Sequence, residues 1–498
     1  MSTTTETPVT RYSGFRRPKT AGLLDTSTGA SLTWLADLFV VMMTFSYVPG
    51  WVGALLVVQL ILFAFSLVVK DADGQTYWER GVRRVRFLVF TATGFTFYRA
   101  KLTKATPLTG VLSHSVALEY TTSLGVKFVL IYHPFAQQYV LVLILNPVGG
   151  ERHDRKDRDK LTAMLGVFGT AMGNLPTAAQ WTITTESAPR TRAETRGKMD
   201  AYIRTDDEDL AAVITRERLG VGVDHHIANT TWASVTFNAV TKGNTVKAHE
   251  ANATHIAKLM PGIISRLSEA GGGHIEPATE RDAAEYARAA LDPQARPIIE
   301  AAHAEGTSTG LDWTNCGPQT MRPTYDYVIH DGGVSQTLIA SGMPGGAITD
   351  NVLGNLVAPH GEVPIKRVTL VKQVIDTARA NVLTSRDLAN AELRREANRR
   401  SGLARMEERI AARASDAQAE GHGLEDFTLI VTVTVTDPPK LEEAVETVRG
   451  QLAGGVAIRL RPAYGQQDTM LYYGLPFGLD LHAHSVSESV SKASTRVR

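Results

Sequence analysis

"LTWLADLFVVMMTFSYVPGWVGALLVVQLILFAFSLVV", residues 32–69, contains one charged residue, Asp37, and one break, at Pro49-Gly50. Each apolar piece is close to the roughly 20 residues that a helix needs to cross about 30 Å of hydrocarbon. A Pro-Gly pair is a natural place for the chain to reverse. The stretch therefore predicts a transmembrane helical hairpin over residues 31–70, with Pro49 and Gly50 at the membrane turn. A cleaved signal peptide is disfavoured, because roughly 30 polar residues precede the first apolar piece.

Basic residues on both sides of the hairpin predict its orientation. They are Arg11, Arg16, Arg17 and Lys19 before it, and Lys70, Arg80, Arg83, Arg84 and Arg86 after it. By the positive-inside rule, this protein would cross the cell (inner) membrane twice and keep both termini in the cytoplasm. We expect the four arginines from Arg80 to Arg86 at the membrane surface, where each is worth about 1 kcal/mol beside anionic lipid.

Asp37 is the exception within the apolar stretch. A carboxylate in the middle of a membrane costs about 2.5 to 3.5 kcal/mol on insertion scales. Two interpretations follow: Asp37 is a functional proton or partner site, or it lies near the interface or against another subunit. We favour the second.

The composition beyond the hairpin is that of folded protein. Residues 71–498 are too many for one ordinary domain and predict two or three compact units. Lys plus Arg number 52 and Asp plus Glu number 51, so no bulk field favours nucleic acid, and we expect no strong direct nucleic-acid binding. The single cysteine, Cys316, excludes an internal disulfide and a multi-cysteine zinc site.

Strand and helix patterns occur in a similar order twice. "VKFVLIYHPFAQQYVLVLIL", residues 126–145, predicts two strands, and a helix, two strands and a further helix near residues 248–270 follow. A comparable order returns after residue 335, interrupted by a long charged helical stretch at 377–420. The pattern predicts an α+β protein in which the hairpin precedes tandem α/β-sandwich units with antiparallel sheets. We expect a cytoplasmic tail (1–30), the hairpin (31–70), a first α+β domain (71–275), a second α+β domain with the charged helical arm (276–480) and a flexible tail (481–498).

The chain lacks the pattern of a phosphate-binding P-loop. Its one Gly-Lys pair, Gly197-Lys198, is followed by Met199, and position 192 is arginine where a P-loop has glycine. We therefore expect no Walker-type ATP binding, no cofactor and no metal.

Two further strings resemble catalytic motifs without their context. "GTSTG" around Ser308 matches a nucleophile elbow, but its flanks predict a helix and a loop instead of a strand and a helix. His249 and His255 in "HEANATH" are six residues apart, so a helix turns them to different faces. Neither string predicts catalysis.

Asp224-His225-His226 is the strongest enzymatic signal. Asp224 and His225 are of the residue types that bind a divalent metal in phosphoesterases. The alternative function is therefore a membrane-tethered metal-dependent phosphoesterase that uses Asp224 and His225. A loop before the strand at Thr230 is the simpler interpretation, because such a site needs further ligands in a defined cluster.

Several segments resemble one family. "RRPKTAGL" (16–23), "DGQTYWERGVRRVRF" (73–87), "FTFYRA" (95–100), "GMPGGAITDNVLGNLV" (342–357), "VTLVKQVID" (368–376) and "MLYYGLPFGLD" (470–480) carry the resemblance. Together with the hairpin they resemble actinobacterial conjugation proteins of the PrgI-like membrane class, over about residues 11–480. In that class, a two-helix membrane subunit is joined to a domain like the N-terminal, non-ATPase part of the conjugative transport ATPase of type IV secretion systems.

The resemblance implies a function. It implies a non-catalytic inner-membrane scaffold of a DNA-transfer apparatus, with no enzymatic activity, that docks a separate ATPase, other transfer subunits and copies of itself. The segment expected to lead toward the ATPase comprises Gly474, Leu475, Pro476, Phe477 and Gly478. Asp37 and the missing nucleotide-binding half depart from the family pattern. An adaptor that moves protein instead of DNA is a third possibility.

Overall fold

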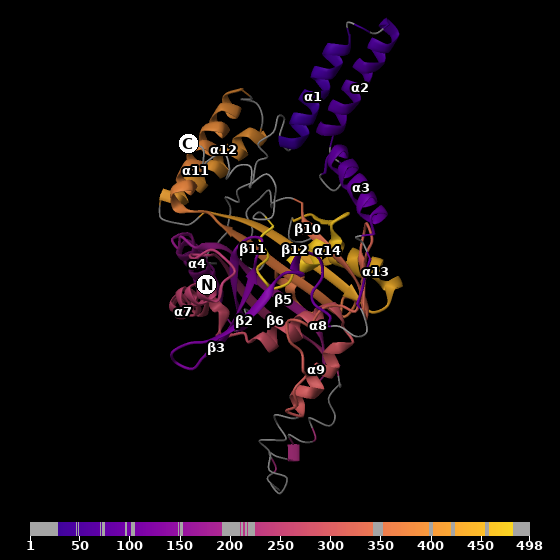
Figure 1. Cartoon of the computed structure of the whole chain (residues 1–498). Helices are drawn as coiled ribbons and strands as arrows, with labels where there is room; N and C mark the ends of the chain where they lie inside the picture. Colours follow the sequence, from indigo (N-terminus) through magenta and orange to yellow (C-terminus); the bar gives the residue numbers. More distant parts are fainter. Residues whose placement is uncertain are drawn as a thin grey trace, which may run out of the picture.

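The computed structural model describes residues 28–45, 47, 49–69, 71, 75–94, 97–100, 105–147, 149, 153–191, 210, 213–214, 217, 225–341, 352–397, 402–419, 424–453 and 458–481. These residues form an apolar helical hairpin, a connecting helix and a body built on one large antiparallel sheet (Figure 1). The α+β class predicted from the sequence is confirmed.

The hairpin consists of α1 (Thr28–Phe45) and α2 (Gly50–Val68), which lie side by side and project from the body (Figure 1). Pro49 is the N-cap of α2, and its carbonyl accepts the amide hydrogens of Val52 and Gly53 at 2.9 and 3.1 Å. Among the described residues, one stretch, Gly50–Leu67, is long and apolar enough to cross a membrane. The apolar part of α1, Ala30–Phe45, is shorter.

Helix α3 (Tyr77–Ala92) connects the hairpin to the body. Thr76 caps it: its Oγ1 accepts the amide hydrogen of Glu79 at 3.2 Å, and Glu79 Oε2 accepts that of Thr76 at 3.4 Å. This capping box satisfies amides that a helix start leaves free. Trp78 packs edge to face on Phe63 of α2, with ring centroids 4.7 Å apart. The start of α3 is thereby held against α2.

The sheet contains thirteen strands within the described part of the chain. The order is β1-β8-β9-β10-β12-β11-β5-β6-β4-β3-β2, while β7 pairs with β4 and β13 with β10. All these pairings are antiparallel. The strands are β1 (Tyr98–Arg99), β2 (Val116–Thr121), β3 (Lys127–His133), β4 (Gln138–Asn146), β5 (Ala178–Thr191), β6 (His225–Asn238), β7 (His274–Pro277), β8 (Thr320–Pro323), β9 (Val328–His330), β10 (Gly333–Ala340), β11 (Ile365–Val374), β12 (Glu425–Val435) and β13 (Leu460–Pro462).

The strand order repeats within the sheet. In the first half β3, β4, β6 and β5 are neighbours and β7 pairs with β4, and in the second half β9, β10, β12 and β11 are neighbours and β13 pairs with β10. The helices at equivalent points are α4 (Arg155–Gly173) and α7 (Val246–Leu267) in the first half, and α10 (Gly354–Val357) and α13 (Leu441–Thr447) in the second. The two related units expected from the sequence are thus halves of one continuous sheet, not separate sandwiches.

The two halves meet where β5 and β11 pair. Their register runs from Lys366↔Ser187 to Gln373↔Gln180. The domain boundary expected after residue 275 falls inside β7, which pairs with β4 and so belongs to the first half. The two tails expected at the ends of the chain lie mostly outside the described residues.

Helices cover both faces of the sheet because apolar side chains point alternately to each. On one face, β4 side chains such as Leu141 pack against α4 and α7, and β12 side chains such as Val433 pack against α13. On the other face lie α8 (Glu280–Leu291), α14 (Gln467–Tyr473) and the C-terminal segment, residues 474–481. Helix α9 (Ala295–Ala304) packs on α8 and β5.

The C-terminal segment crosses the junction between the halves. Thr369 of β11 donates its hydroxyl hydrogen to the carbonyl of Gly474 at 2.6 Å. Thr236 of β6 donates likewise to the carbonyl of Gly478 at 2.8 Å. Phe477 between them is fully buried. The segment therefore ties strands of both halves together.

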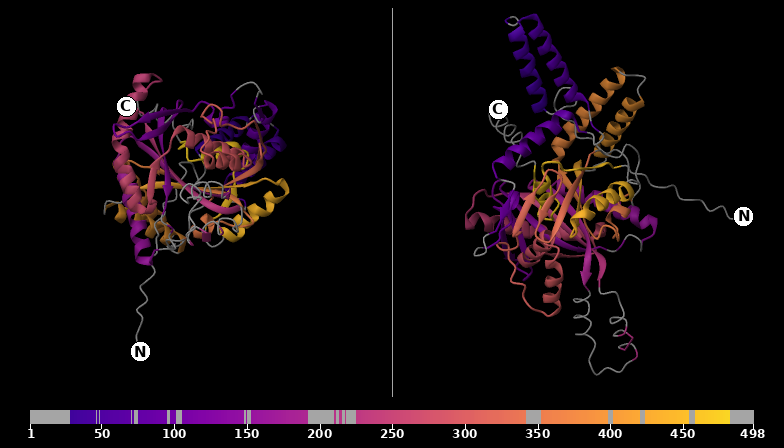
Figure 2. Two further views of the ribbon diagram at one scale, coloured as in Figure 1. Left: turned by 90° about the horizontal axis from the view of Figure 1, so that it is seen from below. Right: turned by 90° about the vertical axis from the view of Figure 1, so that its right-hand side faces the viewer.

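Helices α11 (Thr377–Ala397) and α12 (Gly402–Ala419) form an arm inserted between β11 and β12. They pair with each other through contacts that include Arg394 to Glu407 at 3.5 Å and an ion pair of Arg395 with Glu408. The arm projects from the body on the same side as the hairpin (Figures 1 and 2). The short turns of helix are η2 (Gly110–Leu112), η4 (Ser268–Gly272), η5 (Pro438–Lys440) and η6 (Val448–Leu452).

Gly478→Ala tests the C-terminal segment. Gly478 has φ +58°, and a Cβ there would lie 2.5 Å from both Thr236 Oγ1 and Val140 Cγ1. We expect a loss of roughly 2 kcal/mol in the free energy of unfolding from backbone strain and overpacking. Denaturant unfolding of the detergent-solubilised protein measures it. Gly361→Ala, where a Cβ would meet nothing within 4 Å, is the matched control and should change stability by less than about 0.5 kcal/mol. Equal effects of the two changes would contradict this account.

Candidate functional site

The hairpin exposes a large apolar surface. Side chains more than half exposed include Leu32, Phe39, Val40, Met42, Met43 and Phe45 of α1, and Trp51, Leu55, Val58, Ile61, Leu62 and Phe65 of α2. Soluble proteins rarely expose contiguous apolar patches beyond a few hundred Å². A surface of this kind is normally covered by lipid or by another protein.

Asp37 lies inside the hairpin and has a partner there. Its Oδ2 accepts a hydrogen bond from Gln59 Nε2 of α2 at 3.0 Å. A polar pair between two apolar helices lowers the cost of placing a carboxylate in an apolar environment. The partner of Asp37, which the sequence did not identify, therefore lies on the other helix of the same hairpin.

Helix α3 is amphipathic, with an exposed apolar face. Val82, Val85, Leu88 and Val89 are between 44% and 62% exposed. At 3.6 residues per turn, these side chains fall on one side of the helix, and its arginines lie around the rest. Helix α3 buries no residue completely.

The arginines expected at a membrane surface do not all have the same surroundings. Arg80 pairs with Asp71, and its guanidinium carbon lies 5.7 Å from the ring centroid of Tyr464. The guanidinium of Arg84 lies 5.6 Å from the ring centroid of Tyr325, which stacks on Tyr464 at 5.5 Å. Cation–π contacts of this kind contribute about 0.5 to 1 kcal/mol each when exposed. Arg80 and Arg84 thus dock α3 on the body.

Arg83 and Arg86 line a cavity of about 440 Å³ between α3 and the body. Aromatic side chains, including Trp78, Phe87 and Phe90, form part of its wall. Asp468 and Thr469, at the start of α14, close it on the side of the body. The cavity therefore has an apolar wall and charged groups of both signs.

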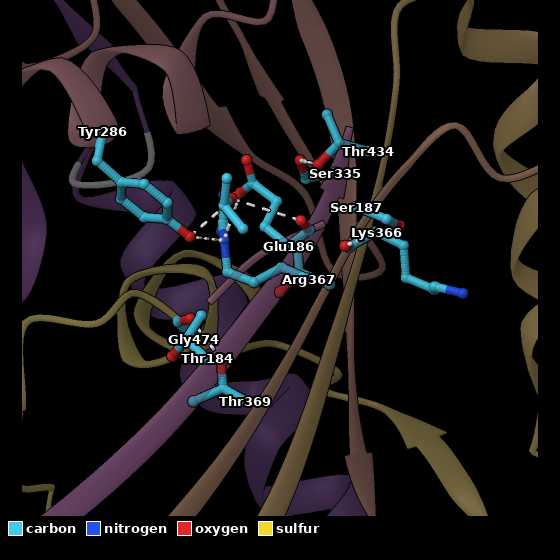
Figure 3. Close-up of polar contacts among 12 residues, drawn as sticks. Thr184, Glu186, Ser187, Tyr286, Ser335, Lys366, Arg367, Thr369, Thr434 and Gly474 are labelled. Carbon is cyan, nitrogen blue, oxygen red and sulfur yellow. Dashed lines mark hydrogen bonds and ion pairs between the residues drawn. The ribbon is translucent and has the colours of Figure 1, made fainter. Parts of the chain in front are cut away.

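A buried ionic cluster lies at the junction of the halves (Figure 3). The Glu186 cluster comprises Glu186 on β5, Tyr286 on α8, Arg296 on α9 and Arg367 on β11. Arg367 donates from Nε and the terminal NH2 group to Glu186 Oε2 at 2.9 and 2.6 Å, and Arg296 pairs with Oε1. Tyr286 donates to Glu186 at 3.3 Å. Three other elements, α8, α9 and β11, therefore converge on this carboxylate of β5.

The electrostatics of the Glu186 cluster keep the carboxylate charged. Burial alone would raise the pKa of Glu186, but the charges of Arg296 and Arg367 outweigh burial and hold the pKa at about 2. Burial raises the pKa of Tyr286, which stays a neutral hydrogen-bond donor. Glu186 has no access to solvent. The cluster is therefore built for structure, and its charges are directed at one another.

A second cavity, of about 920 Å³, lies beside the Glu186 cluster. Its charged walls include Glu285, whose Oε2 lies 2.7 Å from His303 Nε2, and Glu300, which accepts from Thr191 at 2.7 Å. Arg296 also lines this cavity, and its buried Nε has no hydrogen-bond partner among the described residues. The cavity is therefore lined in part by polar side chains, most of which already have a partner within the protein.

The segment expected to dock an ATPase is buried. Gly474, Leu475, Pro476, Phe477 and Gly478 all lie within the body, and Leu475 and Phe477 belong to its core. The sheet and α8 cover the segment, so its role toward an ATPase stays a prediction. Its apolar residues and glycines serve close packing within the chain.

The enzymatic alternatives find little support among the described residues. Asp224, like Gly197-Lys198, lies outside them, and His225 begins β6 paired with Thr191. No group of three or more His, Cys, Asp or Glu residues placed to hold a metal ion occurs in the described part. Ser308 lies in a loop after α9, where its Oγ accepts the amide hydrogen of Gly310 at 3.3 Å. Cys316 is buried, which raises the pKa of its thiol to about 12.

His249 and His255 lie on one helix, α7, but bond different partners. His249 Nδ1 lies 2.8 Å from the hydroxyl of Tyr139, while His255 Nε2 lies 3.3 Å from that of Thr177. Both histidines therefore have structural roles.

Comparison with known protein families and with characterised proteins finds no match for this chain.

Sequence reasoning missed the Glu186 cluster and the two tyrosines that hold α3. Glu186 stands within an otherwise apolar and hydroxyl-rich strand, and a lone carboxylate there is the signal that could have indicated a buried partner. Its partners lie 110 and 181 residues away in the chain. Tyr325 and Tyr464 carry no local signal of their contacts with α3.

Glu186→Gln tests the cluster. The change leaves the buried charges of Arg296 and Arg367 without a counterion, so we expect a loss of roughly 3 to 5 kcal/mol in the free energy of unfolding. Denaturant unfolding followed by tryptophan fluorescence measures it. Glu119→Gln is the matched control. Glu119 pairs with an exposed Lys127 at 3.5 Å, so this change should lower the free energy of unfolding by at most about 1 kcal/mol. Equal losses in the free energy of unfolding for Glu186→Gln and Glu119→Gln would contradict the role given to Glu186.

Lowering the pH should reduce the free energy of unfolding, because Glu186 becomes protonated. The pKa of Glu186 falls from an ordinary value of 4.5 to about 2 on folding, so the unfolded chain binds the proton more readily. The resulting stability is fully present above pH 4.5 and is lost as the pH falls toward 2. Unfolding free energies measured across this range should fall more steeply for the wild type than for Glu186→Gln. Parallel curves would show that Glu186 is not the group responsible.

Proposed function

We propose that this protein is a non-catalytic inner-membrane scaffold of a conjugative DNA-transfer apparatus of the type IV secretion kind, which docks a separate transport ATPase. The observation that carries the membrane part is the exposed apolar hairpin on a folded, polar body. The sequence resemblance carries the identity of the apparatus. The missing P-loop pattern supports a division of labour in which another protein hydrolyses the nucleotide.

The dimensions of the hairpin support a two-pass anchor. Helix α2 has 19 residues and α1 has 18, and at 1.5 Å per residue they reach about 27 to 29 Å, close to the hydrocarbon thickness of a bilayer. The apolar part of α1 is the shorter one, and it contains Asp37. The hydrogen bond from Gln59 to Asp37 makes a second crossing less costly. The arginines of α3 at the base of the hairpin favour a cytoplasmic body.

The body has the features of a docking platform. Its two halves share one sheet, and the buried charges of Glu186, Arg296 and Arg367 are directed at one another at the junction. The exposed features are the charged arm α11–α12 and the edges of the sheet. The arm stands on the hairpin side of the body (Figure 1), where neighbouring copies or other membrane-bound subunits are within reach. We assign partner contacts to this arm in place of the buried segment 474–478.

Removal of the hairpin tests the function. The full chain should stay with the membrane after washing with high salt and alkali and should leave it only in detergent. A chain without residues 28–69 should be recovered in the aqueous fraction, and cells carrying it should lose DNA transfer. Cell fractionation and mating assays measure the two results.

The control addresses the enzymatic alternative. Asp224→Asn combined with His225→Ala should leave DNA transfer unchanged, because a scaffold has no metal-dependent turnover. Three results would overturn the proposal: a full chain recovered in water without detergent, nucleotide hydrolysis by the purified chain alone, or metal-dependent hydrolysis that this double change abolishes.

A further inference from the structure

Helix α3 lies across the base of the hairpin. In the right-hand view of Figure 2, the hairpin rises from the body while α3 turns away from its axis toward one side. If α2 stands along the bilayer normal, α3 lies near the plane of the membrane surface. Its exposed apolar residues Val85, Leu88 and Val89 are then available to contact lipid. An amphipathic helix with an arginine-rich polar face commonly lies in this interfacial plane.

The four arginines of α3 divide into two pairs by their surroundings. Arg80 and Arg84 are engaged with Tyr464 and Tyr325 on the body. Arg83 and Arg86 line the cavity of about 440 Å³, where the guanidinium of Arg86 lies 5.6 Å from the ring centroid of Phe90 on the same helix. The first pair holds the helix on the body, and the second pair lies in the wall of the cavity.

The chemistry of the cavity matches a phospholipid headgroup. Two guanidinium groups suit a phosphate, because each presents a planar fork of N–H donors. On the opposite side, Asp468 and Thr469 offer acceptors for hydroxyl groups. Glu79, which also lines the cavity, is already engaged at the N-cap of α3. Trp78 stands in the wall, and tryptophan is a side chain enriched at the membrane–water interface.

We propose that this cavity binds the headgroup of an anionic phospholipid of the phosphatidylglycerol type, with its phosphate on Arg83 and Arg86 and its hydroxyl groups toward Asp468 and Thr469. The inference rests on the membrane anchoring of the proposed function. Burial raises the pKa of Asp468, although Thr469 Oγ1 donates to its Oδ1 at 3.5 Å, and a hydroxyl donor from the headgroup would add a further hydrogen bond to this carboxyl group. The bound lipid would join α3 to α14 and so hold the body at a fixed orientation to the membrane.

Exchange of arginine for lysine distinguishes a specific phosphate-binding site from non-specific electrostatic attraction to anionic lipid. A polybasic surface attracts anionic lipid by charge alone, so lysine replaces arginine there without loss. A site that holds a phosphate through guanidinium forks does not tolerate this exchange. The test pair is therefore Arg83→Lys with Arg86→Lys, and the matched control is Arg84→Lys on the same helix.

The experiment uses the full-length protein in detergent micelles doped with equal amounts of phosphatidylglycerol and phosphatidylcholine. Lipids that stay bound through washing are quantified by mass spectrometry. We expect the wild type and Arg84→Lys to retain phosphatidylglycerol preferentially, and the double variant to lose that preference about tenfold. Circular dichroism and gel filtration verify that all three chains are folded.

Each other outcome overturns the inference. If the double variant retained phosphatidylglycerol as the wild type does, the preference would come from surface charge alone. If the wild type retained both lipids equally, the cavity would not be a phosphatidylglycerol site. Preferential retention of phosphatidylethanolamine in a parallel mixture would refute the assignment of a glycerol headgroup. None of these results touches the anchoring, which fails separately if the full chain does not fractionate with membranes.

Discussion

The paired charges of Glu186 and Arg367 are the interaction on which the arrangement of the body depends. The two residues face each other in the register of β5 and β11, the strands through which the halves of the sheet meet. Arg296 from α9 and Tyr286 from α8 reach the same carboxylate. A one-residue slip of this pairing would leave a charge buried without its partner, at a cost of several kcal/mol. The cluster therefore selects one register and one placement of the covering helices.

That placement extends from the junction to the base of the hairpin. Once β5 and β11 are paired, Thr369 and Thr236 can hold the C-terminal segment across both halves. The segment continues directly from α14, which lies beside the cavity near α3. Tyr464 and Tyr325 then present their rings to Arg80 and Arg84. A continuous series of contacts thus connects the centre of the sheet to α3 at the base of the hairpin.

This organisation is compatible with the proposed scaffold function. Its strongest charges neutralise one another inside the body, where they stabilise a shape instead of a transition state. The exposed features are the apolar hairpin, the amphipathic α3 and the charged arm α11–α12. All three lie on or toward one side of the body (Figures 1 and 2). This common side is the one that the proposed function places toward the membrane and other membrane-bound subunits.

The sequence by itself determined what depends on neighbouring residues. The apolar run around Pro49-Gly50 defined the hairpin, and the periodicity of apolar residues located most strands and helices and their repeated order. Local spacing also argued against a P-loop. Only the tertiary structure decided that both halves share one sheet, that segment 474–478 is buried, and that Arg80 and Arg83 have different surroundings. These features depend on contacts between residues far apart in the chain, such as Glu186 with Arg367, 181 positions later. Periodicity reports which face of an element is buried, but it contains no information about which distant element covers that face.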